Sequence, residues 1–395
     1  MSGAAAQAAP SAGWTRWGLL GAFALLVATT QVLWLTFAPV TVESARALGV
    51  SEGLVGDLAV VNPLLFVVLA LPAGRFVDRS LHPTLTAGAL LTAAGALVRL
   101  VDPGSYGWQL AGQLLASVAQ PLVLTATTTL AARAFAAHQR TTAISVGSAA
   151  QFVGVLVGAL GGAPLVAAGG LPLLLRAHAG LAVVAALAVL GMLRVATLAP
   201  VGARDSHGLA WLRHEPLLWR LAGLLLVGVG VFNALATWLD PVMTGLGRPG
   251  SGGPLIAVTT VAGVLGAALL PGPVAARRRR RAFLVGATAC TATVFALLVV
   301  TNAPVVAGVL LAVLGFVLLA GLPVALEWSE AHVGVARSGT ATAVLLLAGN
   351  LGGVLLVLLV QPFVGVPRVA LAVIALAALP GAALALSLPR REEAA

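Results

Sequence analysis

Five amide side chains interrupt apolar stretches that are long enough to cross a membrane: Gln31, Gln120, Gln151, Asn233 and Asn350. A polar group inside a membrane span is costly unless it is paired or faces a wet cavity. An amide can hydrogen-bond a hydroxyl or an amine without imposing charge, so this set suits the binding of a small polar solute. The alternative is that the amides hydrogen-bond neighbouring helices, which is worth ~0.6–2 kcal/mol per contact.

Trp34 adds an aromatic face to this set. An indole face attracts a desolvated cation with ~2 kcal/mol. We expect Trp34 and Gln120 to contact a solute, with Asn233 and Asn350 across a cavity. For Asn233 and Asn350, contact between helices is an equal alternative. For Gln151 it is the favoured interpretation, although Gln151 stays a candidate for solute binding.

Acidic side chains are sparse in the apolar stretches, although a proton-coupled carrier needs a titratable group deep in a span. Asp57 and Asp240 lie near the outer ends of two stretches, where they either attract cations or are solvated charges. Glu327 lies near an inner end. It is either a gate or proton site, or the partner of Arg337 or of a helix terminus. No stretch carries a proton relay at its centre, so uniport and symport both stay open. Arg99, near an outer end, is expected to snorkel.

These residues need elements that carry them through a bilayer, whose core is ~30 Å thick and takes a helix of about 20 apolar residues. The sequence is 60% hydrophobic and 9% charged, whereas soluble proteins average about 25% charged residues. We predict an all-α integral membrane protein with twelve transmembrane helices. The expected spans are 17–40, 54–73, 85–100, 108–132, 142–165, 171–193, 219–239, 254–275, 283–300, 304–326, 340–360 and 368–388.

All 22 basic residues are arginine, and their placement predicts the topology. With a cytoplasmic N-terminus, 17 of them fall on the inner side and 5 on the outer side, which is the positive-inside pattern. Both termini are therefore predicted to be cytoplasmic, in an inner or plasma membrane. The run from Arg277 to Arg281 becomes an inner loop that meets anionic lipid, and we do not expect it to bind nucleic acid.

Short repeats divide the chain into two halves. The pair Leu71-Pro72 returns 199 residues later as Leu270-Pro271, and Pro121 returns 202 residues later. Such echoes predict two pseudo-symmetric six-helix halves with a solute site near the midplane between them. The expected organisation is a disordered cytoplasmic N-terminus at 1–16, a first half at 17–195, a cytoplasmic linker at 196–217, a second half at 218–388 and a cytoplasmic tail at 389–395.

A charged turn follows the second apolar stretch and reads Gly74-Arg75-Phe76-Val77-Asp78-Arg79. It resembles the signature loop of the major facilitator superfamily between helices 2 and 3, although the trailing glycine and basic pair of that loop are absent. Gly74 permits a close helix approach, and Asp78 can face a helix N-terminus or an arginine of the other half. We expect Gly74, Asp78 and Arg79 to form a gate whose contacts break when the halves rock. An ordinary charged turn is the alternative.

A narrower resemblance rests on four stretches: Trp34-Leu-Thr-Phe-Ala-Pro39, Leu71-Pro-Ala-Gly-Arg-Phe-Val-Asp78, Gly112-Gln-Leu-Leu-Ala-Ser-Val-Ala-Gln120 and Gly321-Leu-Pro-Val-Ala-Leu-Glu327. They resemble the feline leukaemia virus subgroup C receptor-related solute carriers, a branch of the same superfamily. The resemblance implies transport of choline- or ethanolamine-like solutes, with haem also proposed for some members. Trp34 and Gln120 match choline-site residues of that family. Asn350 replaces a glutamine and Asn233 replaces a tyrosine, so half of the aromatic cage is missing.

Four glycines in the stretch 142–165 allow two interpretations: Gly154, Gly158, Gly161 and Gly162. Their spacing resembles the helix-5 motif of drug/proton antiporters, but Ala159 stands where that motif has a proline. Small residues at this spacing also allow two helices to pack closely, and this is the interpretation that we favour.

Several function classes are excluded by what the sequence lacks. It has no lysine, and therefore no phosphate-binding Gly-x-x-x-x-Gly-Lys-Ser/Thr loop. It also has no metal-spaced Cys/His cluster and no nucleophile–His–acid set, so we predict neither an enzyme nor a cofactor. We expect a monomeric transporter of a small polar, cationic organic solute. The alternatives are a proton-coupled drug or metabolite efflux antiporter and a non-transporting receptor or scaffold.

Overall fold

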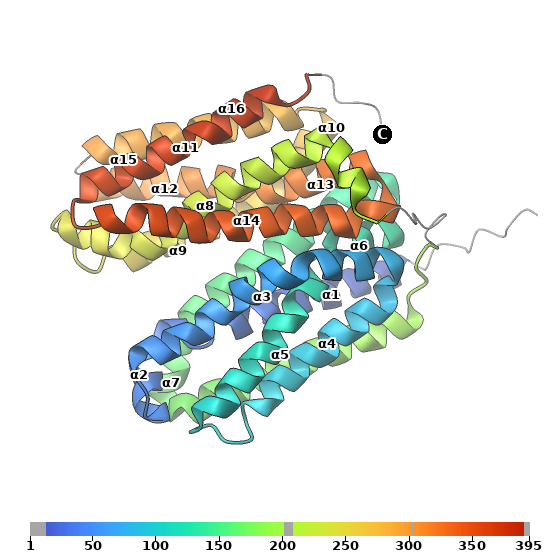
Figure 1. Ribbon diagram of the computed structural model, residues 1–395, viewed down its shortest axis with the longest axis horizontal. Coiled ribbons are helices and arrows are strands. Elements are labelled where there is room, and N and C mark those ends of the chain that lie inside the picture. The colour runs from blue at the N-terminus through green and yellow to red at the C-terminus, as the bar shows by residue number, and fades with distance from the viewer. Residues whose placement is uncertain (1–12, 201–207, 302, 391–395) are drawn as a thin grey trace, which may run out of the picture.

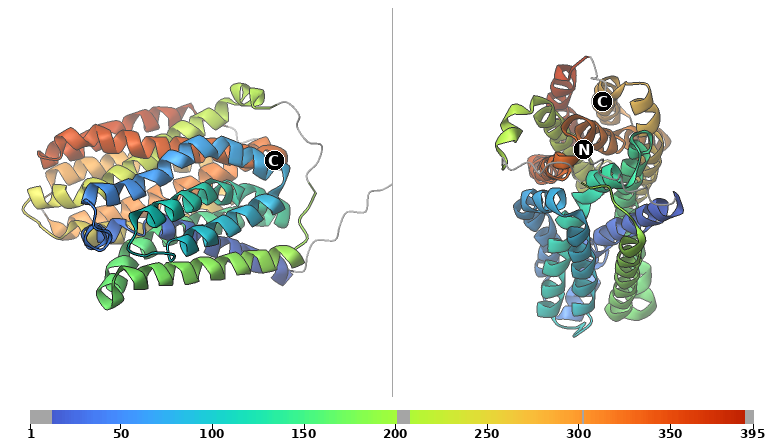
Figure 2. Two further views of the ribbon diagram at one scale, coloured as in Figure 1. Left: turned by 60° about the horizontal axis from the view of Figure 1, so that its bottom comes forward. Right: turned by 90° about the vertical axis from the view of Figure 1, so that its right-hand side faces the viewer.

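The computed structural model describes residues 13–200, 208–301 and 303–390, and every regular element in these ranges is a helix. Figure 1 shows that the helices form two bundles, one from each half of the chain. Figure 2 shows the same two bundles from the side and from one end. Helices are expected here because a helix satisfies its backbone hydrogen bonds internally, as the interior of a membrane requires.

The elements follow one another with short connections. The first bundle contains α1 (Gly13–Trp34), η1 (Ala38–Val40), α2 (Thr41–Leu48), α3 (Glu52–Arg79), α4 (Leu81–Val98), α5 (Tyr106–Leu124), α6 (Ala126–Ala134) and α7 (Ala137–Val195). After η2 (Ala210–His214), the second bundle contains α8 (Pro216–Gly245), α9 (Gly252–Leu269), α10 (Pro271–Ala276), α11 (Arg280–Val300), α12 (Pro304–Leu318), α13 (Gly321–Val333), η3 (Val335–Arg337), α14 (Ser338–Val360), η4 (Gln361–Phe363), α15 (Pro367–Ala377) and α16 (Leu379–Ser387).

Ten helical segments of the described chain are long and apolar enough to cross a membrane, or eleven when α5 and α6, bent by 42°, count as one span. The longest is α7 with 59 residues, which would be ~89 Å if straight, nearly three times the ~30 Å bilayer core. It is not straight, because Gly169 and Gly170 have non-helical backbone angles and join two helices across a kink. The break lies between the predicted spans 142–165 and 171–193.

The ends of the halves differ in part from the predicted boundaries. Residues 13–16 were expected to be disordered, but α1 begins at Gly13. The ring of Trp17 packs edge-on against Phe135, with centroids 4.9 Å apart, and this contact anchors the start of α1. The predicted linker contains η2, and its chain is held by Trp219, which donates to the Leu212 carbonyl at 2.8 Å. The rest of the predicted N-terminal segment at 1–12, residues 201–207 of the linker and residues 391–395 of the tail lie outside the described residues.

Buried apolar side chains form a shared core at one end of the molecule and separate cores towards the other. The shared core joins residues such as Val77 of α3 to Leu345 of α14. A second core, around Phe37, contains residues of the first bundle alone, and a third, around Phe295, contains residues of the second bundle alone. Figure 1 agrees, because the bundles meet near α6 and α13 and diverge towards α2 and α9. The bundles are therefore packed together mainly at one end.

Glycines bring α7 close to the segment that runs from α1 into η1. A Cβ atom on Gly154 would lie 2.7 Å from the Cα of Ala28. Gly158 and Gly162 face the same segment, whereas a Cβ on Gly161 would have open space around it. Helix packing therefore accounts for three of the four glycines singled out in the sequence.

The substitution Gly154→Ala should destabilise the first bundle by about 1–3 kcal/mol, the usual cost of adding a methyl group to a tightly packed site. Gly161→Ala is the matched control and should leave stability unchanged or raise it slightly, because alanine is the better helix former. Thermal unfolding of the purified protein in detergent measures both. Equal unfolding temperatures for the two variants would show that α1 and α7 do not approach so closely.

Candidate functional site

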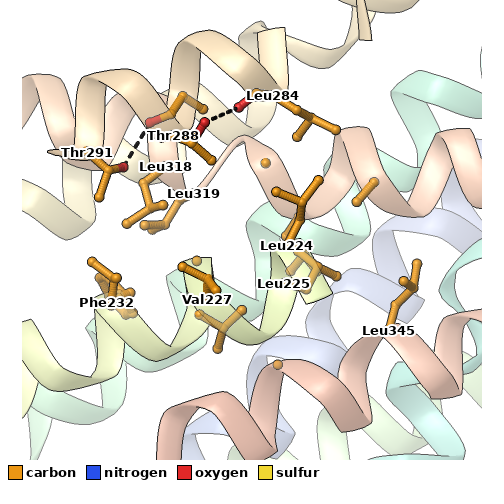
Figure 3. A pocket seen from close by; sticks show the side chains of 18 of the residues that line it. Leu224, Leu225, Val227, Phe232, Leu284, Thr288, Thr291, Leu318, Leu319 and Leu345 are labelled. Atoms are coloured by element: carbon orange, nitrogen blue, oxygen red, sulfur yellow. Dashed lines mark hydrogen bonds between the residues drawn. The ribbon is translucent and has the colours of Figure 1, made fainter. Parts of the chain in front are cut away.

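A cavity of about 950 Å³ opens within the second bundle, next to the first. Small-molecule sites are typically clefts of ~300–1,000 Å³. Side chains of α8, α11, α12, α13 and α14 form most of its wall, and α7 of the first bundle contributes Gln151 and Phe152. In Figure 3, Phe232 of α8 lies across the cavity from Thr288 and Thr291 of α11. The cavity therefore has the size of a small-molecule site and is shared by both bundles.

Four polar side chains line this cavity, and most of their hydrogen bonds stay within their own helix. Thr288 and Thr291 each donate to a carbonyl of the preceding turn of α11 at 2.9 Å, and Figure 3 shows this type of contact. The Asn350 Nδ2 group donates to a carbonyl of α14 at 2.9 Å. Gln151 makes no hydrogen bond to another described residue. The Gln151 amide and the Asn350 Oδ1 atom are therefore available to a solute.

Two aromatic rings meet at the cavity, one from each bundle. Phe152 and Phe232 have centroids 6.4 Å apart and an interplanar angle of 70°, an edge-to-face arrangement. Sequence reasoning missed both residues. A signal was present, because each ring is next in sequence to an amide that was singled out, Gln151 and Asn233. The neighbouring side chain, one position along the helix, is the one that reaches the cavity in the case of Asn233.

The structure places the predicted solute contacts in different surroundings. Gln151 and Asn350 line the cavity. The Trp34 indole N–H donates to a backbone carbonyl of α3 at 3.0 Å. Gln120 of α5 is buried, with 3% of its surface exposed, and Asn233 packs against a glycine of α14. Trp34, Gln120 and Asn233 are not part of the cavity wall, and their contact with a solute stays a prediction.

Arg99 is buried, with 1% of its surface exposed, so the expectation that it snorkels is wrong. Its guanidinium donates to the Leu33 carbonyl at 3.3 Å, to the Thr36 hydroxyl at 2.9 Å and to the amide oxygen of Gln113. The Phe37 ring centroid lies 5.4 Å from its central carbon. Because the Leu33 carbonyl belongs to the last turn of α1, the positive charge meets the negative end of that helix. Arg99 thus caps α1 from within the bundle.

The predicted gate residue Asp78 reaches across the seam between the bundles. Its carboxylate accepts hydrogen bonds from the Gly339 N–H at 2.7 Å, the Thr340 N–H at 2.9 Å and the Thr340 hydroxyl at 2.5 Å. These groups begin α14, whose positive dipole end favours a carboxylate. Gly74 permits the approach, because a Cβ there would lie 2.6 Å from the Gly339 carbonyl oxygen. The predicted contact with a helix N-terminus is confirmed. Arg79 is exposed, and the gating role of these residues stays a prediction.

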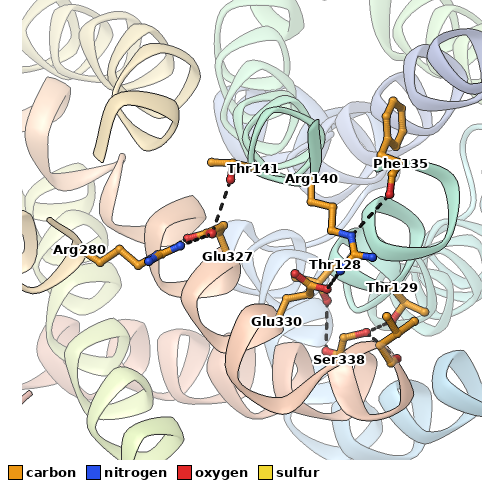
Figure 4. A network of polar contacts seen from close by, with 10 residues as sticks. Thr128, Thr129, Phe135, Arg140, Thr141, Arg280, Glu327, Glu330 and Ser338 are labelled. Atoms are coloured by element: carbon orange, nitrogen blue, oxygen red, sulfur yellow. Dashed lines mark hydrogen bonds and ion pairs between the residues drawn. The ribbon is translucent and has the colours of Figure 1, made fainter. Parts of the chain in front are cut away.

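Glu327 of α13 lies in the same seam (Figure 4). Two nitrogens of Arg280 donate to its two carboxylate oxygens at 2.7 Å each. The hydroxyl of Thr141, in the first bundle, donates to it at 3.5 Å. The expected partners, Arg337 or a helix terminus, are therefore wrong. Arg280 begins α11 and presents the planar fork that matches a carboxylate, while the Arg337 guanidinium lies over the Trp211 ring, 4.8 Å from its centroid.

Glu330, one turn further along α13, links the bundles directly. It pairs with Arg140 of the first bundle at 3.1 Å, with 4% of the glutamate side chain exposed. Next to this pair, the Thr129 and Ser338 hydroxyls lie 2.8 Å apart across the seam (Figure 4). Thr128 donates to the Ser338 carbonyl at 3.1 Å. The seam is therefore closed at this end by an ion pair, hydroxyl contacts and the Asp78 carboxylate.

The remaining charged candidates lie outside the seam. Asp57 and Asp240 are exposed, towards the end where the bundles diverge, and a role in coupling stays a prediction for both. In the run from Arg277 to Arg281, the first three side chains are exposed. Arg281 donates to two carbonyls near the end of α16 at 3.0 Å each. At least two of the five arginines therefore make contacts within the second bundle.

Reversing either charge of the Arg140–Glu330 pair should loosen the seam, because each reversal places two like charges side by side. The reporter is disulfide formation between Thr129→Cys and Ser338→Cys in a Cys290→Ser background. We expect Arg140→Glu and Glu330→Arg each to lower the disulfide yield about tenfold, the effect of ~1.4 kcal/mol.

The double reversal Arg140→Glu/Glu330→Arg should restore most of the yield, since it rebuilds an ion pair of opposite polarity. Arg79→Glu is the matched control, because it reverses an exposed arginine near the same end and should leave the yield unchanged. A double variant that behaves like the single variants would mean that the pair does not hold the seam.

Comparison with known sequences places the chain in a family. The profile of the Major Facilitator Superfamily matches residues 12–357. Solute carrier family 49 member A3 of Danio rerio is 35% identical over 275 residues, which cover 65% of this chain and 58% of that protein. The protein of the same name from Xenopus tropicalis is 32% identical over 153 residues, covering 36% of this chain and 32% of that protein. The chain thus matches less than two thirds of the length of these relatives.

Solved structures share the arrangement of two bundles. The human organic anion transporter MFSD10 (TETRAN) superposes with a TM-score of 0.75 at 14% identity, covering 94% of this chain and 99% of that one. A bacterial homologue of the iron transporter ferroportin, in an outward-facing state, superposes with a TM-score of 0.72 at 15% identity, covering 94% and 98%. At these identities the likeness shows the fold alone. Together with the sequence profile, it shows that the chain belongs to the Major Facilitator Superfamily and is a membrane transporter, not an enzyme.

Proposed function

We propose that this transporter moves a small organic solute by alternating access, as a facilitative or secondary-active carrier, with the solute held in the cavity next to the seam. The observation that carries the proposal is the position of the cavity. Its wall includes residues of both bundles, while hydrogen bonds between the bundles gather at one end around Asp78 and Glu330. Rocking of two bundles about such a site exposes it to each side of the membrane in turn.

We further propose a topology of twelve spans, with α7 counted as two, and both termini in the cytoplasm. The break at Gly169 and Gly170 supports the count, and the excess of arginine at the closed end supports the orientation. On this topology the closed end faces the cytoplasm, and the run from Arg277 to Arg281 faces anionic lipid there. The protein acts as a monomer in an inner or plasma membrane.

A choline- or ethanolamine-like cation is the first solute to test, because the sequence resemblance implies it. The cavity supports this candidate with the rings of Phe152 and Phe232, since an aromatic face attracts a desolvated cation with ~2 kcal/mol. Gln151 and Asn350 can hydrogen-bond its hydroxyl or amine. Trp34 completes the proposed contacts, together with Gln120 and Asn233, during other steps of the transport cycle.

Proton-coupled efflux of a drug or metabolite is the second candidate. The observation in its favour is the pair of buried carboxylates on α13, Glu327 and Glu330, each bound to an arginine at the seam. Protonation of either would remove a charge that the seam contacts depend on, so the closed end would open more readily. This is a way to link proton binding to the rocking of the bundles.

Uptake of radiolabelled choline and ethanolamine into proteoliposomes tests the first candidate. We expect saturable uptake without a pH gradient, and a reduction of kcat/KM of about tenfold in Phe232→Ala, from the loss of one ring–cation contact of ~1.4 kcal/mol. Phe76→Ala is the matched control, because Phe76 is 55% exposed on α3 and should not affect uptake. Uptake that survives Phe232→Ala unchanged would place the solute elsewhere, and no uptake of either compound would remove both from consideration.

The second candidate makes a different prediction in the same vesicles. If efflux is proton-coupled, an imposed pH gradient should accelerate transport, and Glu327→Gln should abolish that acceleration because the titrating group is gone. Asp57→Asn is the control, since Asp57 is exposed and makes no seam contact. Transport that is indifferent to the gradient in the wild-type protein would exclude this coupling.

A further inference from the structure

The wall of the cavity carries no charged side chain. Its lining residues, all within the described chain, are apolar except for four: Gln151, Thr288, Thr291 and Asn350. Both threonine hydroxyls are already occupied by carbonyls of α11, and one half of the Asn350 amide is occupied by a carbonyl of α14. The cavity therefore offers a solute a large apolar surface and the hydrogen-bonding groups of two amides.

The buried carboxylates of the described chain are already neutralised elsewhere. Glu327 is bound to Arg280 and Glu330 to Arg140. Asp78 is half-buried and occupied by the N-terminus of α14. None of these carboxylates lines the cavity, so a cation placed there would have no counter-charge in its wall.

The remaining buried charge is positive and lies in the first bundle. Arg99 has 1% of its surface exposed, and its hydrogen-bond acceptors are the neutral groups of Leu33, Thr36 and Gln113. It adds to the potential that a cation would have to overcome on entering the protein. An anion gains nothing from it inside the cavity, because Arg99 is not part of the wall.

An ion loses its hydration shell when it enters such a site, and it recovers that loss only through a partner charge or several aimed dipoles. Two phenylalanine rings offer weaker compensation than a carboxylate does, since phenylalanine is a poorer cation–π partner than tryptophan. An uncharged body loses little on leaving water and gains from contact with apolar walls. The balance therefore favours an uncharged solute over a charged one of the same shape.

We propose that the cavity recognises an uncharged, lipophilic organic molecule that carries a single hydrogen-bonding group. Its body lies against Phe152, Phe232 and the leucines of the wall, and its polar group is bound by the amides of Gln151 and Asn350. This inference rests on the proposed function, because it names the solute class of the same cavity. It replaces the expected cation with a neutral molecule.

The test compares two photoreactive probes that share one aromatic body and differ in charge: 4-benzoylbenzyl alcohol and (4-benzoylbenzyl)trimethylammonium. Each is irradiated with the full-length protein in proteoliposomes, and crosslinked residues are mapped by mass spectrometry. We expect saturable labelling of the cavity segments of α8, α11 and α14 by the alcohol. The ammonium probe should need a concentration about tenfold higher or more, because the site would bury its charge unpaired.

The variant Asn350→Asp places a carboxylate in the wall and should reverse this order, so that the ammonium probe labels the cavity at the lower concentration. Ala287→Phe fills the cavity from α11 and should remove saturable labelling by the alcohol, which separates the site from general partitioning into lipid. Proper folding of each variant is checked by the disulfide yield between Thr129→Cys and Ser338→Cys.

Equal or stronger labelling by the ammonium probe in the wild-type protein would overturn the proposal and favour the cation. Labelling by the alcohol that Ala287→Phe does not affect would also overturn it, as would the absence of cavity labelling by either probe. None of these outcomes touches alternating access itself, which is judged by solute uptake and by the seam disulfide. Failure of the solute class and failure of the transport mechanism are therefore distinguishable.

Discussion

Every polar group inside this protein must find its partner within the chain, because an apolar surrounding medium supplies none. The polar side chains therefore gather where the fold itself offers charge. Asp78 uses the positive end of α14, Arg99 uses the negative end of α1, and Glu327 and Glu330 each use an arginine. Apolar surfaces of leucine, valine and alanine pack in many registers with similar energies, so these few directional contacts specify how the helices meet.

The same constraint separates two regions with different tasks. The seam holds the bundles through contacts that are individually strong but few, and such contacts can be broken together when the bundles rock. The cavity is apolar, and most of its polar groups are already occupied within their own helices. A wall of this kind binds through shape and apolar contact. Directional polar contacts thus hold the closed state, while the solute is left a surface with little charge of its own.

Sequence reasoning succeeded where a property depends on composition or on a local motif. The apolar stretches, the family and the helix-terminus partner of Asp78 are of this kind. It failed where the outcome depends on which side of a helix faces a neighbour. Trp34 hydrogen-bonds the backbone of α3, and the aromatic residue next to Asn233 lines the cavity in place of Asn233 itself. A shift of one residue turns a helix by about 100°, so the identity of a candidate site residue is sensitive to helix rotation.

From the residues alone follow the helical membrane class and the division into two halves, because both depend on the length and spacing of apolar segments along the chain. Packing of the helices selects the partners of the buried charges. Glu327 binds Arg280 and not Arg337, and Glu330 finds Arg140 190 residues away in sequence. Helix crossing and rotation bring such residues together, and the periodicity of a single helix carries no information about either.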